Sequence, residues 1–449
     1  MKTKYVFLLI TALVFLTGHT VQSQTNRWSL EDCIRYAIEH NLTIKRMEIQ
    51  QSSAEVTLNT SEMSRFPDLN AKMEQNWGFG RTPTATGLYE NTNQSNASFS
   101  IGSSIPLFTG FRIPNEIARD KLELQAAVEN LNKAKEDLSL NIASLFLQAL
   151  FNKELLKINE EQMDLSKMQV DRTSLLVDAG KVPASQLYDI RAQVANDKVN
   201  VVQSDNNLKI SLLDLAQSLE LEQNTGFDIL TPELNDVITE NIGSLKPIDV
   251  IFGSAVQTKP VIKTQELSVE SAEKTLKIAQ SGYMPTLNLT FGYGTNYYYT
   301  YGDNEHPNET LSYQLKNKGQ EYIGLSLNIP IFNRFSVRNQ VRQAQFNIET
   351  QRLTLENAKK DLYKEIQTAY LNATSAREKY RAAVEAVKST SESFKYAQER
   401  YEAGKSTVYE FNEAKTKLAR SLSEEAQAKY DYIFRSKILD FYYGIPIKL

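Results

Sequence analysis

The sequence is poor in the side chains from which most catalytic and metal sites are built. It holds one cysteine and three histidines among 449 residues. Cys33 cannot form an internal disulfide bond, and His40 lies seven residues further on, about 10 Å along a helix, beyond the reach of a thiol–imidazole pair. His19 and His306 are remote from both, and no acid, base and nucleophile cluster together as a hydrolase would need. We therefore expect no enzymatic activity, no metal and no cofactor.

Long apolar runs are missing as well. Lys2 and Lys4 precede an apolar run from Tyr5 to Leu16, which is shorter than the roughly 18 residues of a membrane-spanning helix. The small residue Ser23 follows, so residues 1–23 are predicted to be a signal peptide, with an N-terminal membrane anchor as the alternative. A role inside a membrane would then require β-strands closed into a barrel. The net charge of −4 gives no reason to expect nucleic acid as a partner.

The chain repeats itself at a distance of 224 residues. Ile105-Pro106-Leu107-Phe108 returns as Ile329-Pro330-Ile331-Phe332, and Ala179-Gly180-Lys181 returns as Ala403-Gly404-Lys405. The same shift pairs Phe111 with Phe335, Asn115 with Asn339, Leu131 with Leu355 and Ile142 with Ile366. An ordered series in one register indicates an internal duplication, with repeats at residues 24–246 and 247–449.

Each repeat begins with a helical pattern that a proline ends. The two helices are expected at residues 29–65 and 247–283, before Pro67 and Pro285. Alternating apolar and polar residues follow, as in Leu287, Leu289 and Phe291. They predict strands at approximately residues 68–80, 94–105, 286–301 and 320–329. The segments between the paired strands, at residues 82–93 and 302–318, are polar and are predicted to be loops.

A very long helix comes next in each repeat. Neither glycine nor proline occurs between Pro114 and residue 178 or in residues 336–403, and about 65 residues form a rod of about 100 Å. Leucines 124, 131, 138 and 145 recur every seven residues, which is typical of coiled coils. Gly180 and Gly404 are predicted to end the rods, and return helices are expected at residues 184–219 and 408–443. The fold class is therefore mainly α with β, built from two long antiparallel helical hairpins.

Four strands are too few to close a transmembrane barrel, because known barrels begin at about eight. The duplicated plan, the glycine tips and the strand-to-helix joints at Pro106, Phe108, Pro330 and Phe332 resemble the TolC family of outer-membrane efflux proteins. The resemblance implies a homotrimer with a shared twelve-stranded barrel in outer-membrane lipid and a helical tunnel in the periplasm. It also implies a periplasmic adaptor protein and an inner-membrane transporter as partners, for efflux of RND type or for type I secretion.

The family closes its tunnel with bonds between the helical tips, and the resemblance assigns residues of this chain to that gate. Tyr401 matches the gating tyrosine, whereas the gating arginine falls on Ser406, with Lys405 beside it. The acid of the first repeat falls on Gln186, and Asp189 lies one turn further on. The bonding of the gate is therefore expected to differ from the family pattern.

Two acids near the second tip fall on the family's constriction. Glu410 and Glu413 are three residues apart and share one helical face, so three chains would present six carboxylates and favour cations. The alternative is an ordinary solvated helix face. For the whole chain, the alternative to a channel is an envelope-spanning structural or adhesive coiled-coil protein without a lumen.

Aromatic residues gather in the predicted strands. They are Trp77, Phe79, Tyr297, Tyr298, Tyr299 and Tyr301. Such residues can form a girdle at a membrane interface, and ordinary loop packing is the alternative.

Overall fold

The computed structural model describes residues 27–83, 87–91, 93–222, 226–232, 245–302 and 307–448, so the expected signal peptide lies outside the described residues. The chain divides into two compact units. Residues 46–134 and 256–363 form one, which we call the sheet unit. Residues up to 45, 135–255 and from 364 onwards form the other, which we call the hairpin unit.

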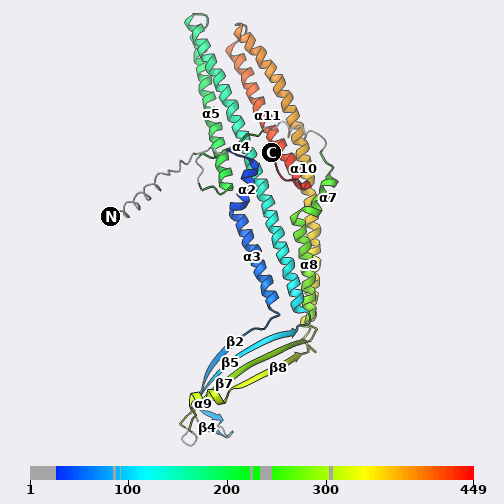
Figure 1. Ribbon diagram of the computed structural model, residues 1–449. Coiled ribbons are helices and arrows are strands. Elements are labelled where there is room, and N and C mark those ends of the chain that lie inside the picture. Colours follow the sequence, from blue (N-terminus) through cyan, green and yellow to red (C-terminus); the bar gives the residue numbers. More distant parts are fainter. Residues whose placement is uncertain are drawn as a thin grey trace, which may run out of the picture. The chain divides into compact units, whose positions relative to one another are not determined.

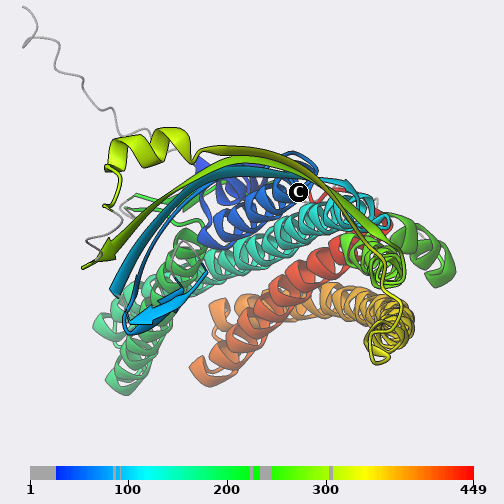
Figure 2. The same ribbon diagram turned by 90° about the horizontal axis from the view of Figure 1, so that it is seen from below.

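Four antiparallel strands form the sheet of the sheet unit, in the order β2-β5-β7-β8. They are β2 (Asn70–Gly78), β5 (Asn93–Phe108), β7 (Thr286–Tyr301) and β8 (Gln320–Asn328). Figure 1 shows these strands side by side, and Figure 2 shows that the sheet is curved. A short hairpin, β3 (Arg81–Pro83) and β4 (Tyr89–Asn91), lies between β2 and β5 in the chain.

The two strand-to-helix joints have the same backbone conformation. Gly110 and Phe111 have φ angles of 61° and 68°, and Arg334 and Phe335, 224 residues later, have 53° and 62°. A left-handed backbone is costly for residues other than glycine. At both joints, a pair of phenylalanine rings packs edge to face, with centroids 5.3 Å apart for Phe108 and Phe111, and 5.8 Å apart for Phe332 and Phe335. The duplication is thus visible in the backbone as well as in the sequence.

Helices pack together in the rest of the sheet unit. They are α8 (Pro260–Ser281) and parts of α3 (Leu42–Met63), α4 (Arg112–Asp178) and α10 (Ser336–Glu402). Asp120 on α4 is buried, accepts a hydrogen bond from the Ser61 hydroxyl on α3 and pairs with Arg119 at 2.7 Å. This pairing compensates the desolvation of the carboxylate.

Two helical hairpins form most of the hairpin unit (Figure 1). In the first, α4 turns at Gly180 into α5 (Ala184–Ser218); in the second, α10 turns at Gly404 into α11 (Val408–Tyr443). Gly180 and Gly404 have φ angles of 66° and 70°, the left-handed conformation that favours glycine. The N–H of Lys181 donates to the Leu176 carbonyl, and that of Lys405 to the Arg400 carbonyl, both at 2.9 Å. These bonds satisfy carbonyls that the helix ends leave free.

A single apolar core joins the elements of the hairpin unit. It collects side chains from α2 (Leu30–His40), α4, α5, the short strand β6 (Asp228–Ile229) and α11. Its most buried members include Leu30, Cys33, Ile142, Phe146, Leu150, Leu215, Ile229 and Ile433. Each large side chain buried there contributes about 1.5–3 kcal/mol to stability. In the described part of the chain, no helix is both long enough and apolar enough to cross a membrane.

The first helix of each repeat differs from the sequence expectation, because each is broken in two. Asn41 has an extended backbone between α2 and α3, and its side-chain oxygen accepts the N–H of Thr43 at 2.8 Å. In the second repeat, α7 (Ile248–Thr258) ends before Lys259, and Pro260 opens α8. The residue before a proline avoids the helical region, which explains this break.

The expected loop after β7 also holds a helix that was not predicted. Helix α9 (Leu311–Asn317) is capped by the Thr310 side chain. The buried Gln314 side chain pairs in both directions with the backbone of Tyr298, at 2.9 Å each way, and Asn308 does the same with Thr300. These amides replace strand partners along the part of β7 that β8 does not reach, and they hold the loop against the sheet.

Candidate functional site

The sheet has two chemically different faces. Successive residues of a strand point to opposite faces, so the strand register sorts them. Ile105 pairs with Leu289, which pairs with Leu325; Phe291 pairs with Ile323 in the neighbouring row. The same face also carries Met73, Trp77, Ala97, Phe99, Ile101, Leu287, Tyr293 and Leu327. The opposite face carries Lys72, Glu74, Asn76, Asn96, Ser98, Ser100, Asn288, Thr290, Asn296, Ser326 and Asn328.

Most of the apolar side chains on this face are exposed in the single chain, and Ala97 alone among them is buried. Ile323, Leu325 and Leu327 have exposed fractions of 78%, 66% and 60%, and Met73 and Trp77 have 68% and 60%. A contiguous exposed apolar surface of this kind marks contact with lipid or with another protein. We call this surface, formed by the apolar residues named above, the apolar face.

On the polar face, the ring of Tyr322 packs closely over two glycines. Gly102 pairs with Gly292, which pairs with Tyr322. The Tyr322 hydroxyl would lie only 3.0 Å from a Cβ placed on Gly102 and 2.7 Å from one placed on Gly292. These two positions therefore need glycine so that the ring can lie along the sheet.

Aromatic rings line the outer part of β7 on the apolar face. Tyr297 and Tyr299 have centroids 6.4 Å apart, and Tyr299 and Tyr301 have centroids 4.8 Å apart. Tyr297 and Tyr299 pair with β5 residues that pair in turn with Gln75 and Trp77 of β2. Tyrosine and tryptophan combine an apolar ring with a polar tip, which suits a membrane–water interface.

The tips of the two hairpins contact each other through residues of α4 and α10. The Arg172 guanidinium donates to the main-chain oxygen of Glu402 at 3.0 Å and lies 3.6 Å from its carboxylate. The hydroxyls of Thr173 and Tyr401 are 3.5 Å apart, and the Tyr401 ring packs against Phe411 with centroids 5.1 Å apart. The family pattern places an arginine after the second glycine, at Ser406, whereas the arginine at this contact is Arg172, before the first glycine.

The remaining gate residues lie around the two turns. Glu410 closes a capping box with Thr407, whose N–H donates to its carboxylate at 3.1 Å. That hydrogen bond, helped by the Ser406 hydroxyl, lowers the pKa of Glu410 below its ordinary value. Glu413, Lys405 and Asp189 are exposed, and Gln186 is half-buried on α5. Among the described residues, Lys405 makes no ion pair.

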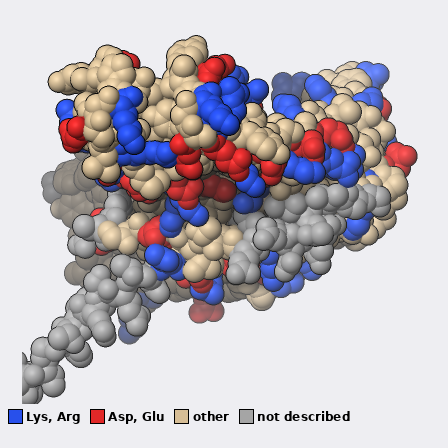
Figure 3. Space-filling model, turned by 90° about the horizontal axis from the view of Figure 1, so that it is seen from above, with Lys and Arg blue, Asp and Glu red and all other residues tan. Residues whose placement is uncertain are grey.

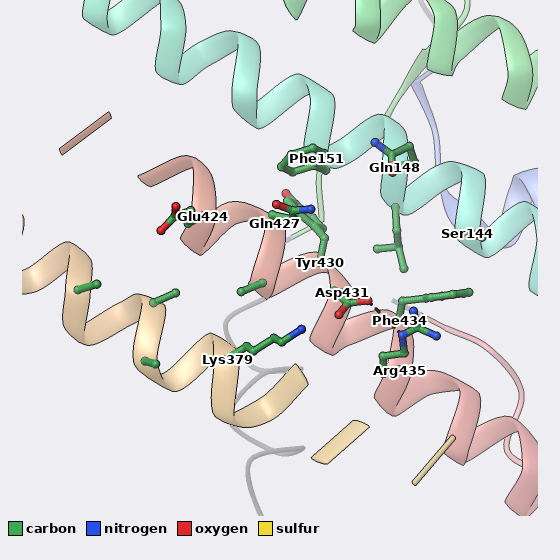
Figure 4. Close-up of a pocket in the computed structure, with 15 residues that line it drawn as sticks. Ser144, Gln148, Phe151, Lys379, Glu424, Gln427, Tyr430, Asp431, Phe434 and Arg435 are labelled. Atoms are coloured by element: carbon green, nitrogen blue, oxygen red, sulfur yellow. Dashed lines mark hydrogen bonds and ion pairs between the residues drawn. The ribbon is translucent and has the colours of Figure 1, made fainter. Parts of the chain in front are cut away.

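A groove of about 860 Å³ lies between α4, α10 and α11 of the hairpin unit. Small side chains on one face of α10, Ala382, Ala383 and Ala386, leave it open. Figure 4 shows Gln148 and Phe151 of α4 beside it and an ion pair of Asp431 with Arg435, 3.1 Å long, on α11. The groove holds both apolar and charged groups, and none of them forms a catalytic arrangement.

Charge is mixed in the view from the end that carries the helix tips. Figure 3 shows Lys and Arg interspersed with Asp and Glu. No field of a single sign arises from such a surface.

Cys33 and His40 both have structural roles, and His19 and His306 lie outside the described residues. Cys33 is fully buried, and burial raises the pKa of its thiol to about 12, so it is unreactive. His40 stacks on Tyr36 and bonds to the Tyr36 carbonyl at 2.9 Å. Within the described ranges, no group of His, Cys, Asp and Glu could hold a metal ion.

An amphipathic four-stranded sheet joined in one chain to paired coiled-coil hairpins defines a class of membrane-associated export proteins. A family model described as outer membrane efflux protein matches residues 33–220 and 252–444, and the chain belongs to this family. The match confirms the resemblance drawn from the duplicated motifs. Export through the outer membrane is its function, and the envelope-spanning structural alternative is not supported.

Individual relatives agree with this assignment. The outer membrane protein TolC of Escherichia coli (strain K12) is 24% identical over 429 residues, 95% of this chain and 84% of the relative. The toxin and drug export protein A of Aggregatibacter actinomycetemcomitans is 21% identical over 79% of this chain and 76% of its own length. The crystal structure of the open state of the Neisseria gonorrhoeae MtrE outer membrane channel covers 92% of this chain and 88% of its own, at a TM-score of 0.71 and 15% identity.

Proposed function

We propose that three copies of this chain form one passive exit channel, with a twelve-stranded barrel in the outer membrane and a helical tunnel in the periplasm. The observation that carries the proposal is the exposed apolar face opposite a polar face. In a closed barrel the apolar face contacts lipid and the polar face lines water. Burying the apolar face in lipid removes the cost of its exposure to water.

The sheet edges support assembly from several copies. Strand β2 pairs only with β5, and β8 pairs only with β7, among the strands of this sheet. Their outer edges therefore present unpaired backbone groups, which lipid cannot satisfy. Because all neighbours in the sheet are antiparallel, β8 of one copy meets β2 of the next in the antiparallel sense, and the pattern continues without a break.

Cysteine cross-linking tests this arrangement. A panel of variants places one cysteine in β2, at Met73 or Gln75, and one in β8, at Ile323 or Leu325. Cys33 is buried and unreactive, so it leaves the background clean. We expect oxidation of the protein in membranes to give covalent dimers and trimers. Products that remain monomeric across the whole panel would refute the shared barrel.

We also propose that the tips form the gate of the tunnel. In each chain, Arg172 takes over the bonding that Ser406 cannot provide, and Tyr401 with Thr173 supports it. These contacts are one exposed ion pair, worth about 0–1 kcal/mol, and two hydrogen bonds of 3.0 Å and 3.5 Å, worth about 0.5–1.5 kcal/mol each, so the gate can open at modest cost.

Glu410 and Glu413 are proposed to line the constriction. Neutralising both, by Glu410→Gln and Glu413→Gln, should lower the preference for cations in planar-bilayer recordings. Glutamine can still complete the capping box with Thr407, so the helix start is preserved. An unchanged reversal potential would mean that these carboxylates belong to a solvated face away from the pore.

A periplasmic adaptor and an inner-membrane transporter are proposed as partners, since the channel itself carries no energy source. The transporter would decide between efflux of RND type and type I secretion. Affinity capture of the tagged full chain from cross-linked cells should recover both partners in fixed proportion.

A further inference from the structure

A charged cluster lies buried between the two hairpins of the hairpin unit. Lys415 on α11, Asp197 on α5 and Ser166 on α4 have exposed fractions of only 3%, 6% and 1%. The Lys415 ammonium lies 2.7 Å from the Asp197 carboxylate and donates to the Ser166 hydroxyl as well. Ser166 donates to the same carboxylate oxygen at 2.5 Å, and Gln193 donates to the other oxygen at 2.8 Å.

The cluster interrupts the coiled-coil seams on which it lies. Leu131, Leu138 and Leu145 hold successive heptad positions of α4, and the next positions are Asn152, Asn159, Ser166 and Thr173. On α5, the buried residues Ile190, Asp197, Ser204 and Ser211 also stand seven apart. The heptad positions of α4 thus change from apolar to polar towards the tip, whereas on α5 Ile190 lies nearest the tip and polar residues follow it. A buried polar residue at one heptad position fixes the alignment of its helices.

The free energy needed to separate Lys415 from Asp197 determines how firmly the cluster holds the two hairpins together. A buried ion pair that loses one partner leaves an uncompensated charge, which is strongly unfavourable, whereas an exposed pair contributes little. The Arg172–Glu402 pair at the tips is 39% and 46% exposed. Separating the hairpins at the tips therefore costs little free energy, whereas separating them at Lys415 costs much more.

We propose that Lys415, Asp197 and Ser166 form a buried clasp that holds the two hairpins of one chain together while the tips beyond it move. These are positioning residues, and the inference rests on the proposed gating function. Ser166 lies 12 residues before the end of α4, and Lys415 lies 7 residues after the start of α11. At 1.5 Å per residue, the moving ends are about 10–20 Å long. Residues 416–435, which reach the groove, stay fixed.

Hydrogen exchange of the full chain in lipid nanodiscs tests the clasp. The variant Arg172→Gln with Glu402→Gln releases the tips and leaves the clasp untouched. We expect amide exchange to rise about two- to five-fold in residues 167–196 and 403–414. Exchange in residues 416–435 should stay as in the unmodified protein. A rise that continues past Lys415 into residues 416–435 would overturn the proposal.

A second comparison removes the clasp itself. Adding Lys415→Met to the released variant should carry the loosening into residues 416–435, with exchange faster by on the order of 100-fold. Arg420→Met on the same helix is the matched control, because its pair with Glu424 is exposed and should contribute little. Equal behaviour of the two methionine variants would refute the clasp. If Lys415→Met does not fold, the first comparison still decides.

These outcomes are separate from the fate of the proposed function. Exchange reports the helices whether or not current flows. A folded protein that shows the expected exchange pattern but never conducts would refute the channel and leave the clasp in place. A protein that conducts, but whose amide exchange in residues 416–435 does not depend on Lys415, would refute the clasp alone.

Discussion

Arginine placed on the apolar face of β8 should prevent stable insertion into lipid. Leu325 pairs with Leu289, yet 66% of it is exposed in the single chain, so its replacement removes few contacts within the protein. Leu325→Arg should therefore change stability little in detergent-free solution. In a bilayer, arginine at the midplane of a barrel wall costs about 2–4 kcal/mol, which lowers the folding equilibrium by about 30- to 1,000-fold.

The neighbouring residue supplies the control. Ser326 belongs to the polar face, where it pairs with Asn288, so Ser326→Arg should cost no more than about 1 kcal/mol. Both variants would be folded into lipid vesicles and unfolded with urea, with tryptophan fluorescence as the readout. Equal destabilisation by the two arginines, or none from Leu325→Arg, would contradict the assignment of the faces.

Three further predictions concern the helical part. Phe146→Ala should lower the free energy of unfolding by about 3–5 kcal/mol in thermal melts followed by circular dichroism, because this ring is buried in the core of the hairpin unit. Gly404→Ala should lower the free energy of unfolding by about 1–2 kcal/mol, because Gly404 has a left-handed φ of 70°. Gly253→Ala inside α7 should instead stabilise the protein, and the reverse order of the two variants would refute the backbone explanation. Burial acts to raise the pKa of Asp228, but hydrogen bonds and the charge of Lys153 outweigh burial and leave the pKa lowered. The stabilisation that ionised Asp228 gives the folded protein should therefore be full above about pH 4 and lost as the pH falls further. Asp228→Asn should remove that pH dependence in acid titrations of the melting temperature.

The long hairpins can be predicted from the sequence because glycine and proline are both absent over each long helix, and a glycine then follows at its end. Glycine at 180 and 404 allows the left-handed turn that each helix end requires. The breaks at Asn41 and before Pro260 are hard to predict from the sequence, because a single residue separates the two helices in each case and the helical pattern continues beyond it. Helix α9 is hard to predict because its buried Gln314 looks polar in the sequence, and its pairing with Tyr298 exists only in three dimensions.

The sites were harder to foresee than the elements. Arg172 and Glu402 are separated by 230 residues, and Ser166 and Lys415 by 249, so no local pattern connects them. The one available signal was the heptad of α4, which continues from leucine into Asn152 and Ser166. A polar residue at a core position requires a partner, but a single sequence does not identify that partner. The family resemblance drew attention to Ser406 rather than to Arg172.

Electrical recording from the full chain in a planar lipid bilayer tests the central claim most directly. A sheet with one face for lipid and one for water, closed by sister copies, predicts discrete current steps as single channels insert. The same purified sample should remain trimeric in mild detergent. Trimeric, folded protein that enters the bilayer without passing current would contradict the account.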